Sequence, residues 1–429
     1  MKLGPIFLAA LVSLLNLDAF GSSASTNAKP VMVYYMPWYA AKPFSGAWGW
    51  HWTMNHFNPD TLNASGEQQI ASWYYPLIGP YDSSDPAVLE YHVLLMKLAG
   101  IDGVIVDWYG SANYLDYAAN NRATARLFDF TRKAGLKFSI CYEDQTIQHM
   151  IDGQYLASTN AIMQAQQDML FLQTNYFSDS SYLRLDGKPV LLNFGPQYFS
   201  ANSDWVKIFS VLAPPNQPAF FTEDNRLADG VGAFDWPPMW LSQTPGTGGV
   251  LSDTALKNYL SDFEQKAKVW PAFISSAFPR FHDIYQRAGN RNYWGYLGDR
   301  NGETLRETLS QAMTDSSAIA QIVTWNDFGE GTAVEPTKEY GYRDLGLIQD
   351  FRRQHLDSNF SFRTNDLVLA LQFYNLRRQS ATNAALTAGL DYVFTNIVMG
   401  KIETAKIQLG QLDSDESGSN NKIQNDRTH

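Results

Sequence analysis

The chain has 429 residues and a formal net charge of −11; 45% of its residues are apolar and only 17% are charged. The apolar content excludes a disordered chain, and an acidic balance without a basic run excludes nucleic acid as a partner. Aromatic residues make up 14% of the chain, a proportion that suits either a large core or surfaces that stack on sugar rings.

The first segment, residues 1–24, has the pattern of a signal peptide. Lys2 precedes an apolar run over residues 6–17, and small residues follow it. A membrane anchor is the alternative, but the run is shorter than the roughly 20 residues that a membrane span needs. We therefore expect a secreted or periplasmic protein without a membrane span. The single cysteine, Cys141, excludes an intramolecular disulfide and lies in an apolar run, which predicts a buried, inert thiol.

Short apolar runs then alternate with longer segments of helical period, the pattern of repeated βα units. The expected strands are 31–35, 103–107, 137–142, 189–194, 219–222, 232–236, 270–275 and 319–325. The expected helices are 86–99, 114–134, 158–176, 204–212, 252–268 and 302–314. Eight strands predict an α/β fold, a (β/α)8 TIM barrel.

The expected barrel has one irregular βα unit, because only residues 223–231 join the fifth and sixth strands. An open, doubly wound sheet is the alternative, although no glycine-rich phosphate loop follows an early strand. We expect the barrel to occupy residues 25–350, a helical extension to follow over 351–412, and a Ser-, Asn- and Asp-rich tail over 413–429 to be disordered.

Acidic and aromatic residues follow most of the expected strands. In a (β/α)8 enzyme the functional side chains lie at the carboxyl ends of the strands. An acid after one strand is commonly a helix cap, but acids and indoles at one rim are what sugar binding and glycoside cleavage need. The candidates, in chain order, are Tyr35, Trp38, Asp107, Trp108, Glu143, Glu223, Asp235, Trp236, Trp240, Trp325 and Asn326.

The most informative segment is residues 324–332, followed by Glu335, a further candidate for substrate binding. Asp327 and Glu330 are three positions apart in a glycine-containing loop after the last strand, so both can point into one pocket. Glycosidic cleavage needs such a pair, one carboxyl group to protonate the leaving oxygen and another to activate a nucleophile. The alternative is a structural loop in which Asp327 caps a helix and Glu330 pairs with Arg343.

The loop after the first strand carries three indoles within residues 48–52, together with His51. We interpret Trp52 and its neighbours as a wall for sugar stacking, with self-packing of the loop as the alternative. The seven His are scattered without a paired ligand motif, so we expect no metal and no cofactor. No Gly-x-Ser-x-Gly elbow is present, which disfavours a serine hydrolase.

These motifs resemble glycoside hydrolase families 99 and 71. The resemblance lies in the first block, residues 33–39, in Gly103-Val-Ile-Val-Asp107-Trp108-Tyr109, and in the strand-eight block, and it covers residues 31–350. It implies an endo-acting barrel enzyme, which cleaves internal bonds of α-linked glycans. The substrates are α-mannosides for family 99 and α-1,3-glucan for family 71. Family 99 carries Glu-x-x-Glu in this loop, whereas this chain has Asp327 in place of the first Glu. The combination of Asp and Glu is instead similar to the family 71 pattern.

The resemblance also implies roles for single residues. Glu330 would be the general acid, and Asp327 the base toward water or the sugar 2-hydroxyl. Glu143 would contact the substrate near the reactive sugar. The residues expected to line the subsites on the non-reducing side are Tyr35, Trp38, Trp108, Asp235 and Trp236.

Two other classes stay open from the sequence. A carbohydrate-binding protein whose catalytic pair has drifted would bind an oligo- or polysaccharide without turnover, and a structural surface protein would have no sugar affinity. The sequence leaves the sugar, the linkage and the stereochemical outcome undetermined.

Overall fold

The computed structural model describes residues 29–290, 293–380 and 383–426, with residues 417–426 described for the backbone alone. The expected signal peptide, residues 1–24, lies outside the described residues. Within the described ranges, no helix has both the length and the apolar character that crossing a membrane requires.

Parallel strands close into a barrel, as the sequence predicts. Its strands are β1 (Val31–Tyr35), β2 (Gly103–Trp108), β3 (Lys137–Tyr142), β5 (Lys188–Asn193), β6 (Ala219–Glu223), β7 (Gly232–Phe234), β8 (Ile274–Ala277) and β11 (Ile319–Ile322). β1 lies between β11 and β2, and β3 pairs directly with β5, which closes the ring and rules out the open sheet. The seventh strand begins later than the expected residue 270, because α8 and a tight turn occupy the residues before it.

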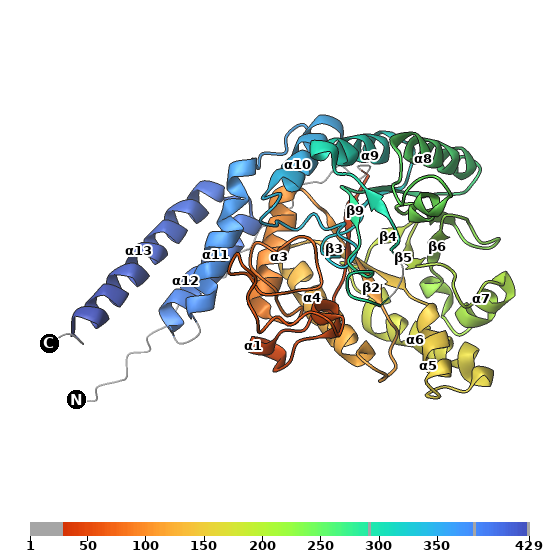
Figure 1. The fold of residues 1–429 in the computed structure, drawn as a ribbon, viewed down its shortest axis with the longest axis horizontal. Helices are drawn as coiled ribbons and strands as arrows, with labels where there is room; N and C mark the ends of the chain where they lie inside the picture. The colour runs from red at the N-terminus through yellow and green to blue at the C-terminus, as the bar shows by residue number, and fades with distance from the viewer. Residues whose placement is uncertain (1–28, 291–292, 381–382, 427–429) are drawn as a thin grey trace, which may run out of the picture.

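Helices cover the barrel from outside (Figure 1). The helices of this part of the chain are α1 (Lys42–Ser45), α2 (Trp50–Thr53), α3 (Pro86–Ala99), α4 (Tyr117–Lys133), α5 (Gln145–Asp152), α6 (Ala161–Leu172), α7 (Asn202–Phe209), α8 (Asp253–Ala267), α9 (Glu303–Thr314) and α10 (Arg343–His355). Residues 224–231 between β6 and β7 form no helix, which is the irregular unit expected from the sequence. α3 shows how local sequence sets an end: Asp85 accepts the Ala87 N–H at 2.9 Å, and Pro86 begins the helix.

Short elements complete the barrel. β4 (Arg184–Leu185) pairs antiparallel with β5, and β9 (Phe281–His282) pairs antiparallel with β10 (Tyr296–Leu297). Single helical turns lie at Ser158–Asn160, Gln173–Phe177, Pro214–Asn216, Met239–Gln243, Arg300–Gly302 and Thr364–Asp366.

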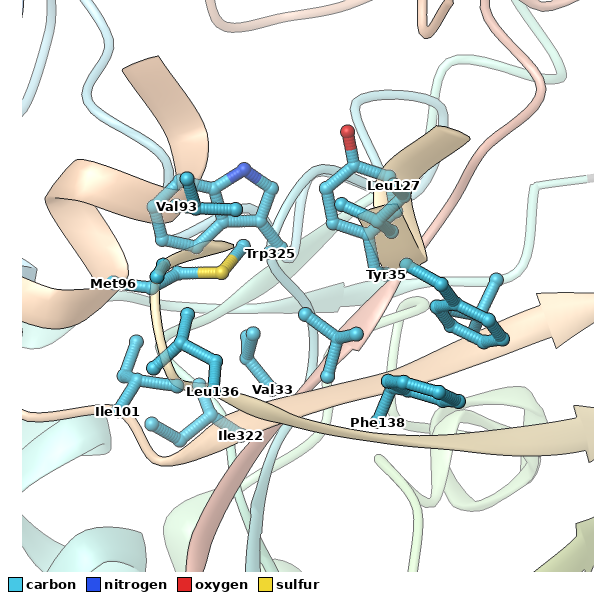
Figure 2. Packing of buried hydrophobic residues seen from close by; sticks show 14 of the residues in the cluster. Val33, Tyr35, Val93, Met96, Ile101, Leu127, Leu136, Phe138, Ile322 and Trp325 are labelled. Atoms are coloured by element: carbon cyan, nitrogen blue, oxygen red, sulfur yellow. The ribbon is translucent and has the colours of Figure 1, made fainter. Parts of the chain in front are cut away.

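The strands separate two buried layers because successive side chains point to opposite faces. Val31, Val33 and Tyr35 of β1 belong to the outer layer under the helices, whereas Met32 and Tyr34 belong to the layer inside the barrel. Figure 2 shows the outer layer, in which Val33 and Tyr35 lie with Trp325 and side chains of α3. The phase of each strand therefore decides which residues can reach a site inside the barrel.

Three further helices follow on one side of the barrel (Figure 1): α11 (Val368–Gln379) and α12 (Ala384–Val398) contact α3, and α13 (Ile402–Asp426) packs on α12 and α11. Arg377 of α11 joins Glu90 of α3 through two hydrogen bonds of 2.8 and 3.1 Å. The Tyr374 ring lies 5.6 Å from that of Tyr91. The helical extension is therefore packed against the barrel.

Two expected boundaries, residues 350 and 413, fall inside helices. Residue 350 lies inside α10, which is part of the barrel layer because Gln349 donates to the Leu98 carbonyl at 2.9 Å. The tail expected to be disordered from residue 413 is helical to Asp426. Buried Ala405 and Leu409 anchor the first half of α13, and no proline interrupts the polar residues that follow.

Candidate active site

A cavity of about 680 Å³ opens at the carboxyl ends of the barrel strands. Carboxylates reach it from several strands: Asp107 from β2, Glu143 after β3, Glu223 from β6, and Asp327 and Glu330 after β11. The cavity lies where barrel enzymes place their functional groups. Among the described residues that line it there is no Lys or Arg.

The loop after β11 holds Asp327 and Glu330 in a closed turn. The Asp327 N–H donates to the Thr324 hydroxyl at 2.8 Å, and the Asp327 carboxylate accepts the Glu330 N–H at 2.9 Å. The Glu330 carbonyl accepts the His282 N–H at 2.8 Å. Gly331 has a φ of +70°, and a Cβ there would lie 2.7 Å from the His282 carbonyl oxygen, so the turn requires glycine.

The structural alternative for this loop is wrong in its main part. Arg343 pairs with Asp299 and Asp344, and not with Glu330. No helix begins at Asp327, since the next one in the chain, α10, starts at Arg343. Asp327 is 3% exposed and lines the cavity together with Glu330.

Behind this loop lies a buried polar network. Asn326 accepts the Met36 N–H at 2.8 Å and donates to the Met36 carbonyl at 2.9 Å, which ties the loop to the end of β1. Tyr81 donates to Glu335 at 2.7 Å, and the other Glu335 oxygen lies 3.2 Å from His92 Nε2. His92 Nδ1 is 2.9 Å from the Tyr35 hydroxyl.

Several residues expected to bind sugar lie outside the cavity lining. Tyr35, Asn326 and Glu335 belong to the buried network, so they hold the loop from behind. Trp52, Trp108 and Trp325 are fully buried; Trp52 donates to the Tyr81 carbonyl at 2.7 Å, and Trp108 stacks on Phe171. Asp235 is buried and accepts the Ser276 N–H at 2.6 Å.

The other expected residues do line the cavity. They are Trp38, His51, Asp107, Glu143, Glu223, Trp236, Trp240, Asp327 and Glu330. Trp38 and His51 stack at 4.1 Å with an interplanar angle of 6°, which gives the cavity a flat wall from the loop after β1. Trp240, 56% exposed, lies at the mouth. In the tryptophan-rich loop, Trp50 and His51 line the cavity, so the stacking interpretation stays a prediction for them, whereas Trp52 packs within the fold.

Sequence reasoning missed other lining residues. They include Tyr34, Met36, Tyr109, Gln145, His149, Phe194, Gln197, Pro237, Met239, Phe281, Tyr285, Asn290 and Trp294. The alternation along β1 could have found Tyr34, which points inward and donates to Asp107 at 2.9 Å. The segment near Trp294 has no such signal, because it enters the site from the long excursion between β8 and α9.

Burial shifts the pKa of several of these groups. Burial raises the pKa of Asp107, and the nearby charges of Glu143 and Asp327 raise it further. Burial raises the pKa of Glu223 to about 8, with added repulsion from Asp224 and Glu143. Burial lowers the pKa of His51. These raised pKa values favour the protonated forms of Asp107 and Glu223, which can donate hydrogen bonds.

Comparisons with known proteins agree with this geometry. The model of glycosyl hydrolase family 99 matches residues 26–213. A glycoprotein endo-alpha-1,2-mannosidase-like protein of Danio rerio is 30% identical over 332 residues, which is 71% of this chain and 70% of the relative. The chain therefore belongs to glycosyl hydrolase family 99. It is a glycoside hydrolase.

Two further matches cover a similar share of this chain at lower identity. The glycoprotein endo-alpha-1,2-mannosidase of Rattus norvegicus is 23% identical over 333 residues, covering 71% of this chain and 67% of the relative. The solved family 99 endo-alpha-mannosidase of Bacteroides thetaiotaomicron has a TM-score of 0.56 and 19% identity, covering 76% of this chain and 97% of that one. The structural match confirms the barrel fold.

Proposed function

We propose that this family 99 hydrolase cleaves α-mannosidic bonds within an oligo- or polysaccharide, with Asp327 and Glu330 as the catalytic pair. The observation that carries the proposal is the turn after β11, which brings both carboxylates to one acidic cavity. The relative of Rattus norvegicus is a glycoprotein endo-alpha-1,2-mannosidase, and that of Danio rerio is named as a protein like it, which supports the choice of substrate.

In the first step, Asp327 takes the proton of the 2-hydroxyl of the sugar being cleaved. The resulting oxygen attacks the neighbouring anomeric carbon while Glu330 protonates the leaving oxygen, which releases the aglycone. In the second step Glu330 takes a proton from water, the water oxygen attacks the anomeric carbon, and Asp327 returns its proton to the 2-oxygen. Each carboxyl group returns to its starting state.

Export is part of the proposal. The apolar run over residues 6–17, preceded by Lys2, supports a signal peptide. Sequencing the N-terminus of the mature protein from its source cells checks this, and a chain that still begins at Met1 would contradict it.

The catalytic proposal is tested with the variants Asp327→Asn and Glu330→Gln on α-1,2-, α-1,3- and α-1,6-linked mannans and on α-1,3-glucan. We expect each variant to lose about 10³-fold in kcat, the range for general acid or base groups, with a Tm close to that of the wild type. Glu303→Gln on α9, with its side chain 58% exposed, is the matched control. Turnover at the wild-type rate in both site variants would disprove the assignment, and a preference for the glucan would correct the substrate.

A further inference from the structure

The hydroxyl of Tyr39 joins the two peptide groups on either side of Asp327. It donates to the Asn326 carbonyl at 2.9 Å and accepts the Phe328 N–H at 3.1 Å. The same N–H also donates to the Asn326 carbonyl at 3.0 Å, so Asp327 is the central residue of a tight turn. One phenol therefore bridges both ends of the turn that carries Asp327.

Tyr39 approaches this turn from outside the space open to the substrate. It lies in the loop after β1, is 3% exposed, and is not among the described residues that line the cavity. Its N–H donates to the Ser83 hydroxyl at 3.1 Å, and its carbonyl accepts the Ser83 N–H at 2.8 Å. Its ring lies 4.1 Å from that of the buried Trp52. The bridge therefore starts from a fixed side chain.

The hydroxyl of Tyr39 can both donate and accept, as the bridge requires. Burial raises the pKa of Tyr39, and the charge of Asp327 raises it further. The phenol therefore keeps the proton that it donates to the Asn326 carbonyl.

The residues next to Asp327 are anchored by their side chains as well. The Phe328 ring lies 6.0 Å from that of Tyr39 and 6.4 Å from that of Tyr81. The Asn326 amide donates to the Tyr81 hydroxyl at 3.0 Å. The Cα of Asp327 is therefore held from both directions along the chain.

The short side chain of Asp327 makes the place of its backbone important. An Asp carboxylate is joined to its Cα by one methylene, and its torsions settle in a few wells, so it moves with the backbone. A base must lie about 2.6–3.2 Å from the oxygen whose proton it takes, and a displacement of about 1 Å can cost about 10²-fold in rate. A group that fixes the peptides around Asp327 can therefore act on the rate without touching the substrate.

We propose that Tyr39 is a positioning residue for this reaction: its hydroxyl bridge holds Asp327 where it takes the proton of the sugar 2-hydroxyl. This inference rests on the proposed function, because Tyr39 acts through the base that the proposed function assigns. It adds the loop after β1 to the parts of the barrel on which turnover depends.

The test compares Tyr39→Phe, Asp327→Asn and the double variant on the mannan that the wild type cleaves fastest. We expect kcat to fall about 10²-fold in Tyr39→Phe while KM stays within about twofold, since no contact with the sugar is lost. In the double variant kcat should equal that of Asp327→Asn alone, because the bridge then has no base to act through. An unchanged kcat in Tyr39→Phe, or a further loss of about 10²-fold in the double variant, overturns the positioning role.

Tyr182→Phe is the matched control. The buried Tyr182 hydroxyl donates to the Val190 carbonyl at 2.9 Å, and Tyr182 is not among the described residues that line the cavity. Both variants lose a buried hydroxyl that bonds to a backbone carbonyl, so the Tm should fall in both. The kcat of Tyr182→Phe should stay within about twofold of the wild-type value. An equal loss of kcat in both variants would reduce Tyr39 to a merely structural role.

Hydrogen exchange of the full-length protein, measured by mass spectrometry, tests the bridge without any turnover. In Tyr39→Phe the Phe328 N–H loses one of its two acceptors, so exchange at residues 326–328 should be at least about tenfold faster than in the wild type and in Tyr182→Phe. Unchanged exchange there overturns the bridge. Wild-type turnover by Asp327→Asn would instead contradict the proposed function and this inference together, whereas an inactive Asp327→Asn beside a fully active Tyr39→Phe overturns this inference alone.

Discussion

Adjacent residues at the end of β2 have opposite surroundings. Asp107 faces the cavity and accepts the Tyr34 hydroxyl, whereas Trp108 is fully buried under the helices, where it stacks on Phe171 and donates to Asn121 at 3.1 Å. The same division separates Tyr34 from Tyr35 on β1. A shift of one position along a strand therefore decides whether a side chain meets the substrate or holds the helical layer.

The largest effect is expected from Trp108→Ala, on the outer side of the strands. The substitution leaves a large void in a packed layer, so we expect the free energy of unfolding to fall by about 3–5 kcal/mol. Urea denaturation measures that loss. The KM of the protein that remains folded, measured at low temperature, should stay unchanged. A raised KM with intact stability would place Trp108 in the substrate site after all.

The inner counterpart is Trp38→Ala. Trp38 lines the cavity and stacks on His51, so we expect a loss of sugar binding, with KM for a long mannan rising about tenfold. Stability should fall less than in Trp108→Ala, because Trp38 is only partly buried. Initial-rate kinetics on folded protein check the effect, and Trp38→Phe, which keeps an aromatic face, is the control. An unchanged KM would mean that the stack only supports the loop.

The barrel and the acidic rim could both be predicted from the sequence. Eight apolar runs separated by helical segments predict the closed sheet, and acids directly after several of them predict Asp107, Glu143 and Glu223 at the cavity. These predictions depend only on local pattern and on the rule that strand ends meet at one rim.

The expected site residues that lie outside the cavity are those whose orientation depends on strand phase or on partners distant in the sequence. Tyr35 and Trp108 were chosen because they end strands, but both point outward in the pleat. Glu335 closely follows the loop that carries Asp327 and Glu330, yet its partners Tyr81 and His92 come from the region before β2, which no local pattern indicates. Trp52 also has a partner that lies distant in the sequence, because its indole N–H donates to the Tyr81 carbonyl.

The smallest expected effect concerns the protonation of the inner side, tested with Glu223→Gln. The pKa of Glu223 is raised from 4.5 to about 8, so the folded protein keeps a proton that the unfolded chain loses. The stability that this group contributes is fully present below about pH 4.5 and is lost as the pH rises through about 8. The free energy of unfolding should therefore fall between pH 5 and pH 8 in the wild type and fall less in the variant. Because the cavity is open to solvent, we expect the fall in the free energy of unfolding from pH 5 to pH 8 to be about 1 kcal/mol larger in the wild type than in the variant.

Denaturation at both pH values measures this difference, with Glu403→Gln, whose side chain is 83% exposed, as the control. Equal slopes in wild type and Glu223→Gln would show that the inner carboxyl is as well solvated as the exposed one, and the contrast between the two sides of the strands would then rest on shape alone.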